Sequence, residues 1–488
     1  MTLDMQLTDT GKTEMPLVEV PEKETSIVET KTPEKPKKKR KWGWLIALII
    51  VLLIGGVIGF AVWKGVSIFQ KIGLKIDAGS LSITNQEPEL QKDSTGKYTN
   101  ALIIGIDTRE NSGGLNTDTL IVSSYNYETN DIVMVSIPRD LSVEIGEDSD
   151  WYNKINAVYA FTKEDDDEEK GILELKRTVE ELTGMEIQYY AMVNFEAFTQ
   201  IVDAVGGVDI NVENSFTDYQ YPLGTGYQTV SFKTGIQTMD GETALKYARS
   251  RHSSDNGEGS DFMRARRQQK VIMAIKDKIL STETLTSPKA IMGIFSAVAD
   301  NIKISTFTIS DIEAALNIAR DFNENSGMSY SFVLDPSAGN SQLVANLSTY
   351  NADGSLAAYV IGPKLGLGKY EDINEYVDHI LVNPGIYSDD PNIYVYNAGL
   401  GTTEVADIVK TLKADYPYIN IINKGTLYSD KEGEYIYTHT ENEFTATIDE
   451  LATKLEITNK TKPEYVTTNL NGEDVTILLG KEIQLVTE

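Results

Sequence analysis

An uncharged apolar run near the N-terminus constrains the architecture of this chain more than any other feature. It extends from Trp42 to Trp63 and directly follows a basic segment, residues 35–41. A helix needs about 20 apolar residues to cross the hydrocarbon core of a bilayer. Tryptophans at both ends match the interfacial belt, and the preceding positive charge favours a cytoplasmic N-terminus. The pattern predicts one transmembrane helix over residues 42–63.

The predicted span also assigns a side of the membrane to the rest of the chain. A cleaved signal peptide is the alternative, but its apolar region is usually shorter and a small-residue cleavage site follows it. With an uncleaved anchor, this is a single-pass cell-membrane protein whose residues after Lys64 are extracytoplasmic. Residues 1–41, rich in Thr, Glu, Pro and Lys, predict a disordered cytoplasmic tail. Residues 64–97 predict a stalk and linker.

Composition excludes several classes of function. The 488 residues are enough for two or three domains, each with its own core. The formal net charge of -29 argues against nucleic-acid binding, because the chain has no broad basic face to displace counterions. Cysteine is absent, which excludes disulfides, thiolate zinc sites and cysteine nucleophiles.

Apolar periodicity predicts an α/β fold class. Runs at 101–106, 119–125, 132–137, 188–193 and 207–212 predict strands, and helical spacing appears at 172–182, 195–205, 242–247, 262–280 and 312–322. This interleaving favours an α/β core over residues 98–385. A second set follows: strands at 392–397, 419–423, 434–438 and 475–479, with helices at 404–415 and 449–455. It predicts a small separate α/β domain over residues 390–482.

Two carboxylates stand beside predicted strands. Asp107 comes just after the strand 101–106, and Asp118 comes just before the next one. Carboxylates at strand ends project into the crevice where α/β proteins bind ligands. Two of them could hold Mg²⁺ and leave positions for phosphate oxygens. Taken singly, either residue is also a common turn or cap residue.

Arginines recur in short motifs although the chain is acidic. Arg109 lies two residues after the first carboxylate, Arg139 closes the strand 132–137, and Arg249 and Arg251 follow a helix that Asp240 is expected to cap. Guanidinium is planar, always charged and suited to bidentate contact with phosphate oxygens. The alternative for each arginine is a surface ion pair or a solvated basic patch.

A third group of polar residues shares one face of a predicted helix. Asp261, Arg264 and Gln268 follow the spacing i, i+3, i+7. Asp261 could hold Arg264 in place or act as a general base, and it could also simply favour the helix dipole. His252, Arg266 and Arg267 receive no role. Together, acids and arginines from separate stretches predict a site for a diphosphate and its metal.

These motifs resemble those of the LytR-CpsA-Psr family of bacterial envelope proteins. Over residues 98–335 the matching segments stand in the family's order: 107–109, 118–119, 137–140, 154–157, 205–209, 239–251 and 261–269. The resemblance implies a mixed sheet core flanked by helices. It also implies a phosphotransferase that moves a glycopolymer from a polyprenyl-pyrophosphate carrier to a peptidoglycan hydroxyl, forming a phosphodiester.

The resemblance also implies residue roles. Asp107 and Asp118 would bind Mg²⁺ (or Mn²⁺), and Asp261 would orient groups or deprotonate the acceptor. The arginines would hold the pyrophosphate, with Gln268 beside them: Arg109, Arg139, Arg249, Arg251 and Arg264. Many relatives carry an arginine where this chain has Asn116. That departure predicts that this loop binds phosphate less tightly, or that another arginine of the chain takes over the contact.

Two further features follow from the resemblance. It implies an apolar groove for the lipid, which Phe195, Phe198, Ile201 and Val202 could line, although such spacing is more often plain core. The segment 392–480 resembles the C-terminal domain often appended to LytR-type proteins, and it is interpreted as a binding or spacing module. Two other functions stay open: hydrolysis of a lipid pyrophosphate, and a non-enzymatic envelope scaffold or regulator.

Overall fold

The structure is a computed structural model that describes most of residues 88–481. Residues 109–114, 147–148, 165–166, 225, 280–300, 307–310, 336–342, 351–355, 440–442, 468–472 and several positions within 312–324 fall outside the description. The predicted tail, transmembrane helix and most of the stalk also lie outside the described residues. Among the residues that are described, no helix is long and apolar enough to cross a membrane.

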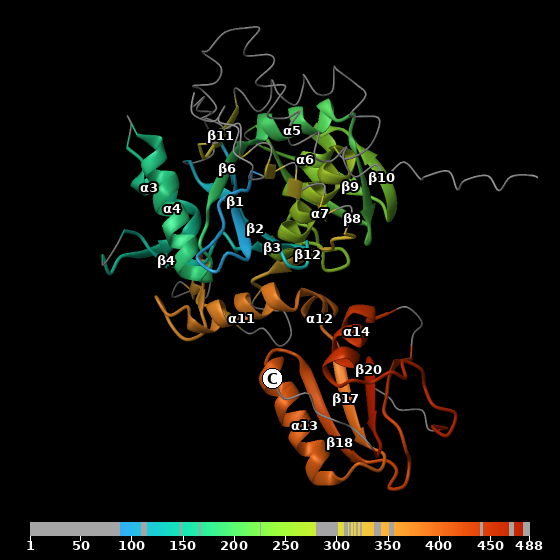
Figure 1. Cartoon of the computed structure of the whole chain (residues 1–488). Helices are drawn as coiled ribbons and strands as arrows, with labels where there is room; N and C mark the ends of the chain where they lie inside the picture. Colours follow the sequence, from blue (N-terminus) through green and yellow to red (C-terminus); the bar gives the residue numbers. More distant parts are fainter. Residues whose placement is uncertain are drawn as a thin grey trace, which may run out of the picture. The chain divides into compact units, whose positions relative to one another are not determined.

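A mixed six-stranded sheet forms the centre of the N-terminal part (Figure 1). Its order is β11 (Ile302–Ile304), β6 (Tyr189–Asn194), β1 (Tyr98–Ile106), β2 (Thr117–Asn126), β3 (Ile132–Ser136) and β12 (Ser329–Val333). The pairs β1–β2, β2–β3 and β6–β11 are antiparallel, whereas β1–β6 and β3–β12 are parallel. The predicted α/β class is confirmed, and the sheet is mixed as the resemblance implies.

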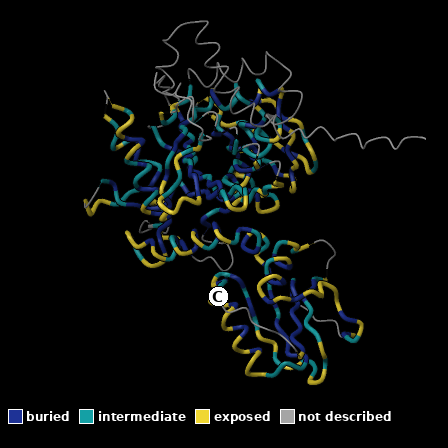
Figure 2. The backbone as a smooth tube through the Cα atoms, in the orientation of Figure 1, coloured by how far each residue is buried: buried dark blue, intermediate teal, exposed yellow. Residues whose placement is uncertain are grey.

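Apolar side chains explain why the sheet and its first helical layer form. Leu102 and Ile104 of β1 are completely buried, as are Val122 of β2 and Val135 of β3. Helix α4 (Glu168–Thr183) is capped by Asp167 and ends at Gly184, whose φ of 72° favours glycine. It buries a helical stripe on the same hydrophobic cluster as the sheet: Ile172, Leu175, Val179 and Leu182. Most of the tube along these strands is dark blue in Figure 2.

A second cluster joins the elements that carry most of the predicted site. Helices α5 (Phe195–Ala204), α6 (Gly241–Arg249) and α7 (Asp261–Ile279) lie with the pair β7 (Val208–Val212) and β10 (Gly235–Met239) and the hairpin β8 (Phe216–Leu223)–β9 (Gly226–Phe232). Asn194 caps α5, and Asp240 caps α6 as predicted. Their shared apolar core includes Val202, Val208, Phe232, Tyr247 and Val271.

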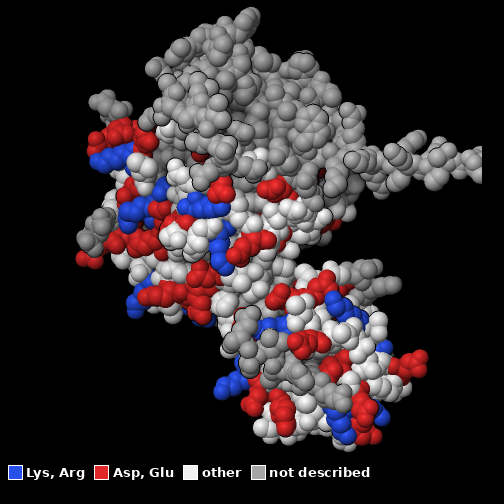
Figure 3. All heavy atoms as spheres, viewed as in Figure 1, with Lys and Arg blue, Asp and Glu red and all other residues white. Residues whose placement is uncertain are grey.

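Shorter elements complete the N-terminal part. They are β4 (Ser142–Glu144), β5 (Tyr152–Lys154), η2 (Ile155–Ala157), α3 (Val158–Thr162), β13 (Val344–Asn346), β14 (Thr349–Tyr350), β15 (Leu356–Ala358) and β16 (Ile361–Pro363). Two helices follow, α11 (Glu371–Val382) and α12 (Pro384–Asp389). On the face that Figure 3 shows, acidic and basic side chains of the described residues are interspersed.

The C-terminal residues form a four-stranded sheet with order β18 (Asn420–Thr426), β17 (Asn392–Asn397), β20 (Val475–Leu479) and β19 (Tyr435–Thr438). Strand β17 is parallel to both neighbours, and β19 is antiparallel to β20. Helices α13 (Thr402–Asp415) and α14 (Thr445–Lys454) accompany the sheet. Buried and exposed positions alternate along α13 with helical spacing (Figure 2).

Most predicted elements are present, with corrections at particular places. The predicted helix 449–455 begins earlier, at Thr445, and β2 begins at Thr117, so that Asp118 lies inside the strand. The predicted helix 312–322 falls partly on residues outside the description. The β8–β9 hairpin and helices α11 and α12 were not predicted. Exposed tyrosines at Tyr219 and Tyr227 weaken the alternation in the hairpin.

Candidate active site

Asp118 and Arg139 are brought together by the register of two central strands. In the antiparallel pair β2–β3, Ile121 lies opposite Ser136, and the next ladder bond joins the Ile137 amide to the Leu120 carbonyl over 2.9 Å. Continuing this register places Asp118 beside Arg139. The Arg139 Nη1 atom donates to Asp118 Oδ1 at 2.6 Å. A charge-assisted bond of this length fixes the guanidinium at the sheet edge.

Asp261, at the start of α7, is the point where three arginines converge. Arg264 Nη1 lies 2.8 Å from Asp261 Oδ1, and Arg251 Nη1 lies 3.5 Å from the same oxygen. Arg139 Nη2 lies 3.5 Å from Asp261 Oδ2. Residues from the end of β3, the α6–α7 connection and α7 therefore share one carboxylate. The predicted convergence of distant stretches is present for Asp118, Arg139, Arg251, Asp261 and Arg264.

Burial and charge act differently on the two innermost arginines. Burial opposes the charge of Arg139, but Asp261 and Asp118 outweigh it and raise the pKa of this guanidinium. Burial lowers the pKa of Arg264, against the attraction of Asp261 and with added repulsion from Arg139. Both remain cationic near neutral pH, because the ordinary arginine pKa is above 12. The pair is a buried concentration of positive charge held by carboxylates.

Two guanidinium donors of the cluster make no hydrogen bond within the described residues. The Nε atoms of Arg139 and Arg264 are buried and have no hydrogen-bond partner among the described residues. The cavity among Asp118, Arg139, Asp261, Arg264 and Gln268 measures only about 20 Å³. A diphosphate is larger than this cavity, so its oxygens must replace the carboxylates as partners of the arginines. Gln268 lies on the same cavity, as its helical spacing predicts.

Arg249 occupies a different environment from the other arginines. It ends α6, and its guanidinium lies 4.1 Å from the ring centre of Phe195 and 5.5 Å from that of Tyr221. Its Nη1 atom donates to the Tyr221 hydroxyl at 3.3 Å. Arg249 forms no ion pair with any residue that the structure describes. A cation held by aromatic rings keeps its charge available for an anion.

The predicted metal ligands lie at one end of two paired strands. Ile106 pairs with Thr117, and a bulge between Gly105 and Ile106 precedes Asp107. A side chain at Gly105 would place its Cβ 2.8 Å from Thr119 Cβ, so glycine permits this close approach. Asp107 is buried, with only 6% of its surface exposed. Asp107 and Asp118 therefore lie at the same end of the sheet, where β1 ends and β2 begins.

The number and type of donors in this pair of carboxylates fit Mg²⁺. Mg²⁺ usually takes one or two protein carboxylates and completes its shell with water and substrate phosphates. Within the described residues, no group of three or more His, Cys, Asp or Glu could hold a metal. Two carboxylates beside a phosphate site agree with this sharing of ligands. Arg109 lies outside the described residues.

Arg267, which the sequence analysis gave no role, is a central buried contact. Its side chain is 2% exposed and pairs with Glu258 at 2.6 Å. It donates to the carbonyl of Tyr247 at 3.1 Å and also to that of Ser250. Arg267 thus fixes α7 to the end of α6, next to Arg249 and Arg251. No local pattern in the sequence indicates this contact, because the acceptors are backbone carbonyls at the end of α6.

Other polar residues near the motifs have supporting contacts. Lys154 Nζ lies 2.5 Å from Asp140 Oδ1, and the Asn156 amide donates to the Arg139 carbonyl at 3.2 Å. The segment 154–157 therefore supports the loop that carries Arg139. The His252 amide donates to Asp218 Oδ2 at 3.3 Å. Among the described residues, His252 belongs to no group of three or more potential metal ligands.

A cavity of mixed character lies next to the carboxylate pair, but other residues than predicted line it. Its volume is about 340 Å³; its apolar lining comprises Ile106, Leu115, Tyr159, Met192 and Ile302, and its polar lining comprises Thr108, Glu168, Asn194, Asn301 and Lys303. Phe198 and Val202 instead pack in the core of the α5–α7 cluster, and Phe195 faces Arg249. The apolar spacing on α5 is therefore mainly core packing, the alternative that such spacing usually indicates.

The fold and this site define a mixed α/β protein with a buried arginine–aspartate centre suited to a phosphorylated ligand. The chain belongs to the LytR-CpsA-Psr family: the family model LytR_cpsA_psr matches residues 69–355.

Relatives with known names share about a third of the aligned residues. The chain is 34% identical over 269 residues to the polyisoprenyl-teichoic acid–peptidoglycan teichoic acid transferase TagU of Oceanobacillus iheyensis, covering 53% of this chain and 76% of that protein. It is 32% identical over 274 residues to TagU of Bacillus subtilis, covering 55% and 79%. Among solved structures, B. subtilis TagV matches with 25% identity and a TM-score of 0.42, over 59% of this chain and 98% of that one.

Proposed function

We propose that this protein transfers a glycopolymer from a polyprenyl-pyrophosphate carrier to a hydroxyl of peptidoglycan. The observation that carries the proposal is the convergence of Arg139, Arg251 and Arg264 on Asp261, beside Asp118. The names of the TagU relatives describe transfer of teichoic acid to peptidoglycan, which is the same class of reaction.

The reaction breaks the phosphoanhydride bond of the carrier and forms a phosphoester bond to the acceptor. The acceptor oxygen attacks the phosphorus that bears the glycopolymer, the bond between the two phosphates breaks, and polyprenyl phosphate leaves. The hydroxyl loses its proton to a base. Charge accumulates on the phosphate oxygens during this exchange, so fixed cations around them lower the barrier.

Each side chain has a role in this exchange. Arg139 and Arg264 leave Asp261 and bind the phosphates through the Nη donors that this releases. Arg249 and Arg251 bind the same headgroup from the end of α6, and Arg109 assists them. Asp261, released from its arginines, is the carboxylate that orients the acceptor hydroxyl or takes its proton.

Asp107 and Asp118 would hold Mg²⁺ (or Mn²⁺). When bound, the ion would neutralise part of the phosphate charge. The apolar part of the cavity beside them, with Ile106 and Met192 in its lining, suits the first part of a polyprenyl chain.

The same proposal covers the location and organisation of the chain. Residues 42–63 anchor it in the cell membrane with the N-terminus in the cytoplasm, and all later residues are extracytoplasmic. This places the arginine site on the side of the membrane where peptidoglycan lies. Residues 390–482 form a separate C-terminal domain with a binding or spacing role.

Reconstitution of the full-length protein in detergent tests the function. The protein is given a short-chain polyprenyl-pyrophosphate glycopolymer, with or without peptidoglycan oligomers, and covalent product and released polyprenyl phosphate are measured. Product that requires the acceptor supports transfer, whereas equal release of polyprenyl phosphate without acceptor would establish hydrolysis.

The Arg264→Ala variant supplies the critical comparison. Removing one preorganised donor from a charged transition state typically costs about 10²–10³ in kcat, and a similar loss is expected here. Lys410→Ala, which changes an exposed cation on α13, is the matched control and should keep full activity. Transfer by Arg264→Ala at the wild-type rate would contradict the assignment of this site.

A further inference from the structure

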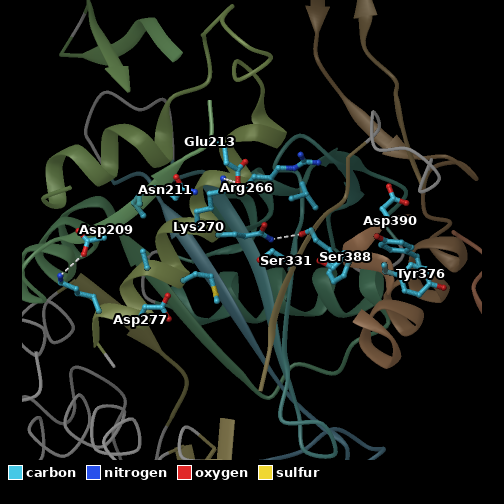
Figure 4. A pocket seen from close by; sticks show the side chains of 18 of the residues that line it. Asp209, Asn211, Glu213, Arg266, Lys270, Asp277, Ser331, Tyr376, Ser388 and Asp390 are labelled. Atoms are coloured by element: carbon cyan, nitrogen blue, oxygen red, sulfur yellow. Dashed lines mark hydrogen bonds and ion pairs between the residues drawn. The ribbon is translucent and has the colours of Figure 1, made fainter. Parts of the chain in front are cut away.

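A second, much larger cavity lies on the face of α7 opposite the arginine cluster. Its volume is about 930 Å³, which falls in the upper part of the range of roughly 300–1,000 Å³ typical of small-molecule sites. Figure 4 shows side chains from β7 and α7 on one side and from the α11–α12 segment on the other. We call this cavity the α7 cleft. Of its described lining residues, only Val333 also borders the cavity of the arginine cluster.

The α7 cleft is lined by one carboxylate more than it has cations: Asp209, Glu213, Asp277 and Asp390 against Arg266, Lys270 and Lys278. Lys270 pairs with Glu213 at 2.7 Å, and Lys278 lies 3.4 Å from Asp209. Arg266 is exposed in the cleft and forms no ion pair with any residue that the structure describes. Asp277 pairs with Lys276 at 3.2 Å, so Arg266 is the one lining cation without an ion pair among the described residues. This suits a mostly neutral ligand that carries an isolated acidic group, and it disfavours a polyanion.

Three tyrosines form the wall on the α11–α12 side. The ring of Tyr376 lies edge-on to that of Tyr418, 5.1 Å between centres at 89°, and 6.1 Å from that of Tyr387 at 78°. Burial raises the pKa of all three hydroxyls, to about 12 for Tyr418, so they remain protonated donors. Tyrosine combines an apolar ring with a polar tip.

The hydroxyl of one of these tyrosines has no hydrogen-bond partner among the described residues. Tyr387 is 6% exposed, and its hydroxyl is buried without a hydrogen-bond partner among the described residues. Leaving such a group unsatisfied costs about 1–3 kcal/mol. Native proteins usually satisfy buried polar atoms, so a rotation of the Tyr387 ring that brought this hydroxyl to a ligand in the cleft would remove the penalty.

We infer that the α7 cleft binds a saccharide chain carrying an acidic group. The partly exposed ring of Tyr418, whose hydroxyl donates to the Asp372 carbonyl at 3.2 Å, offers an apolar surface to a sugar ring, while Ser388 and Asn211 match sugar hydroxyls. Arg266 contacts the acidic group. The identity of the saccharide rests on the proposed function, which supplies two sources: the peptidoglycan acceptor and the glycopolymer donor.

The position of the cleft relates this binding to transfer. Val333 lines both the α7 cleft and the small cavity of the arginine cluster, and Gln269 Nε2 donates to the Phe332 carbonyl at 2.9 Å. Helix α7 is thus held against β12 with one site on each side. A helix with its side chains is about 10–12 Å across. A saccharide chain seated in the cleft therefore has one of its units about one helix width from the phosphates.

Binding measurements without turnover test the inference. Full-length protein in detergent is mixed with peptidoglycan sacculi stripped of attached polymers or with lipid-free wall polymer, and the bound fraction is measured by co-sedimentation or filtration. Ser388→Trp fills the cleft from an exposed position, and Arg266→Ala removes its available cation. Each variant should weaken binding of one saccharide about tenfold or more, which identifies the source. Lys410→Ala should bind as the wild type does.

Wild-type binding of both saccharides by both variants would overturn the inference. Arg264→Ala separates this result from the proposed function, because it should bind both saccharides normally while losing transfer. If Arg264→Ala instead kept transfer, the proposed function would fail and the binding result for the cleft would stand unaffected.

Discussion

Charge is arranged in opposite ways on the two faces of helix α7. On the face with Asp261 and Arg264, carboxylates and guanidinium groups are buried together around about 20 Å³ of space. On the face with Arg266 and Lys270, a cavity of about 930 Å³ is lined by tyrosines and by charged side chains of both signs. The first face suits a compact, highly charged headgroup that replaces existing partners. The second suits an extended polar chain that fills existing space.

This difference teaches how one helix can serve two sites. A buried ion-pair cluster depends on strict geometry, because desolvated charges are costly unless each is paired. A roomy cleft tolerates small shifts, since its contacts are many and individually weak. Substitutions that disturb the packing of α7 should therefore damage the arginine face first.

The largest expected effect comes from Arg267, which fixes α7 to the end of α6. Arg267→Met leaves Glu258 buried without its partner, and breaking one side of a buried pair typically costs about 3–5 kcal/mol. We expect a large fall in the free energy of unfolding, measured by denaturant titration. At temperatures where the variant is folded, transfer should fall more than saccharide binding.

A matched double substitution sharpens this prediction. Replacing Glu258 as well, in Arg267→Met/Glu258→Leu, removes the unpaired charge and should recover part of the lost stability. Because the carbonyls of Tyr247 and Ser250 would still lack their donor, recovery should be incomplete. A single variant as stable as the wild type would show that Arg267 does not hold the two helices together.

A smaller effect is expected at the carboxylate pair. Asp118→Asn removes a proposed metal ligand and weakens the bond that fixes Arg139. Even partners that only support metal ligands typically contribute 10–100-fold to metal affinity, so the Mg²⁺ concentration for half-maximal transfer should rise by roughly that factor or more. Chelation with EDTA should stop transfer by the wild type, and added Mg²⁺ or Mn²⁺ should restore it.

Saccharide binding in the α7 cleft provides the internal control for this substitution. It should be the same for Asp118→Asn and the wild type, with or without EDTA, because no proposed metal ligand lines the cleft. Transfer that persists in EDTA at the full rate would eliminate the metal role of Asp107 and Asp118.

The sequence predicts the arginine face well and the cleft face poorly, for a physical reason. Asp118, Arg139, Asp261 and Arg264 stand in short motifs along an acidic chain, and together these acids and arginines predict a shared site. Arg267 has the same chemistry, yet its role depends on carbonyl groups of α6 that no local pattern reveals. Tyr376, Tyr387 and Tyr418 stand in none of the motifs that predict the site. Only the tertiary arrangement of α7 against α11 and α12 shows that they surround a cavity.

Strand and helix positions were predictable where local patterns agree with packing. β1 and α4 have clear periodicity and were placed within a few residues, whereas the β8–β9 hairpin exposes Tyr219, Leu223 and Tyr227 and lacks that signal. The predicted roles of Phe198 and Val202 show what a clear periodic pattern leaves open. Apolar spacing on α5 indicated burial correctly, but not whether a lipid or the protein's own core covers it.

The smallest expected effect concerns the start of α6, far along the helix from Arg249. Asp240 accepts from the Thr243 amide at 2.8 Å, and its hydrogen bonds with Thr243 lower the pKa of its carboxyl. Asp240→Ala should cost about 1 kcal/mol, the usual value for losing an N-cap. Because the folded-state pKa is lowered, this contribution is present above the unfolded pKa and is lost as pH falls through the folded value. The difference in unfolding free energy between wild type and variant should therefore be constant near neutral pH and shrink below about pH 4.

Asp240→Asn retains a capping oxygen without the charge and should lose less stability than Asp240→Ala. Saccharide binding should be unchanged in both variants, since α6 does not line the α7 cleft, and a loss of binding in either would mean that the two faces of α7 are not independent.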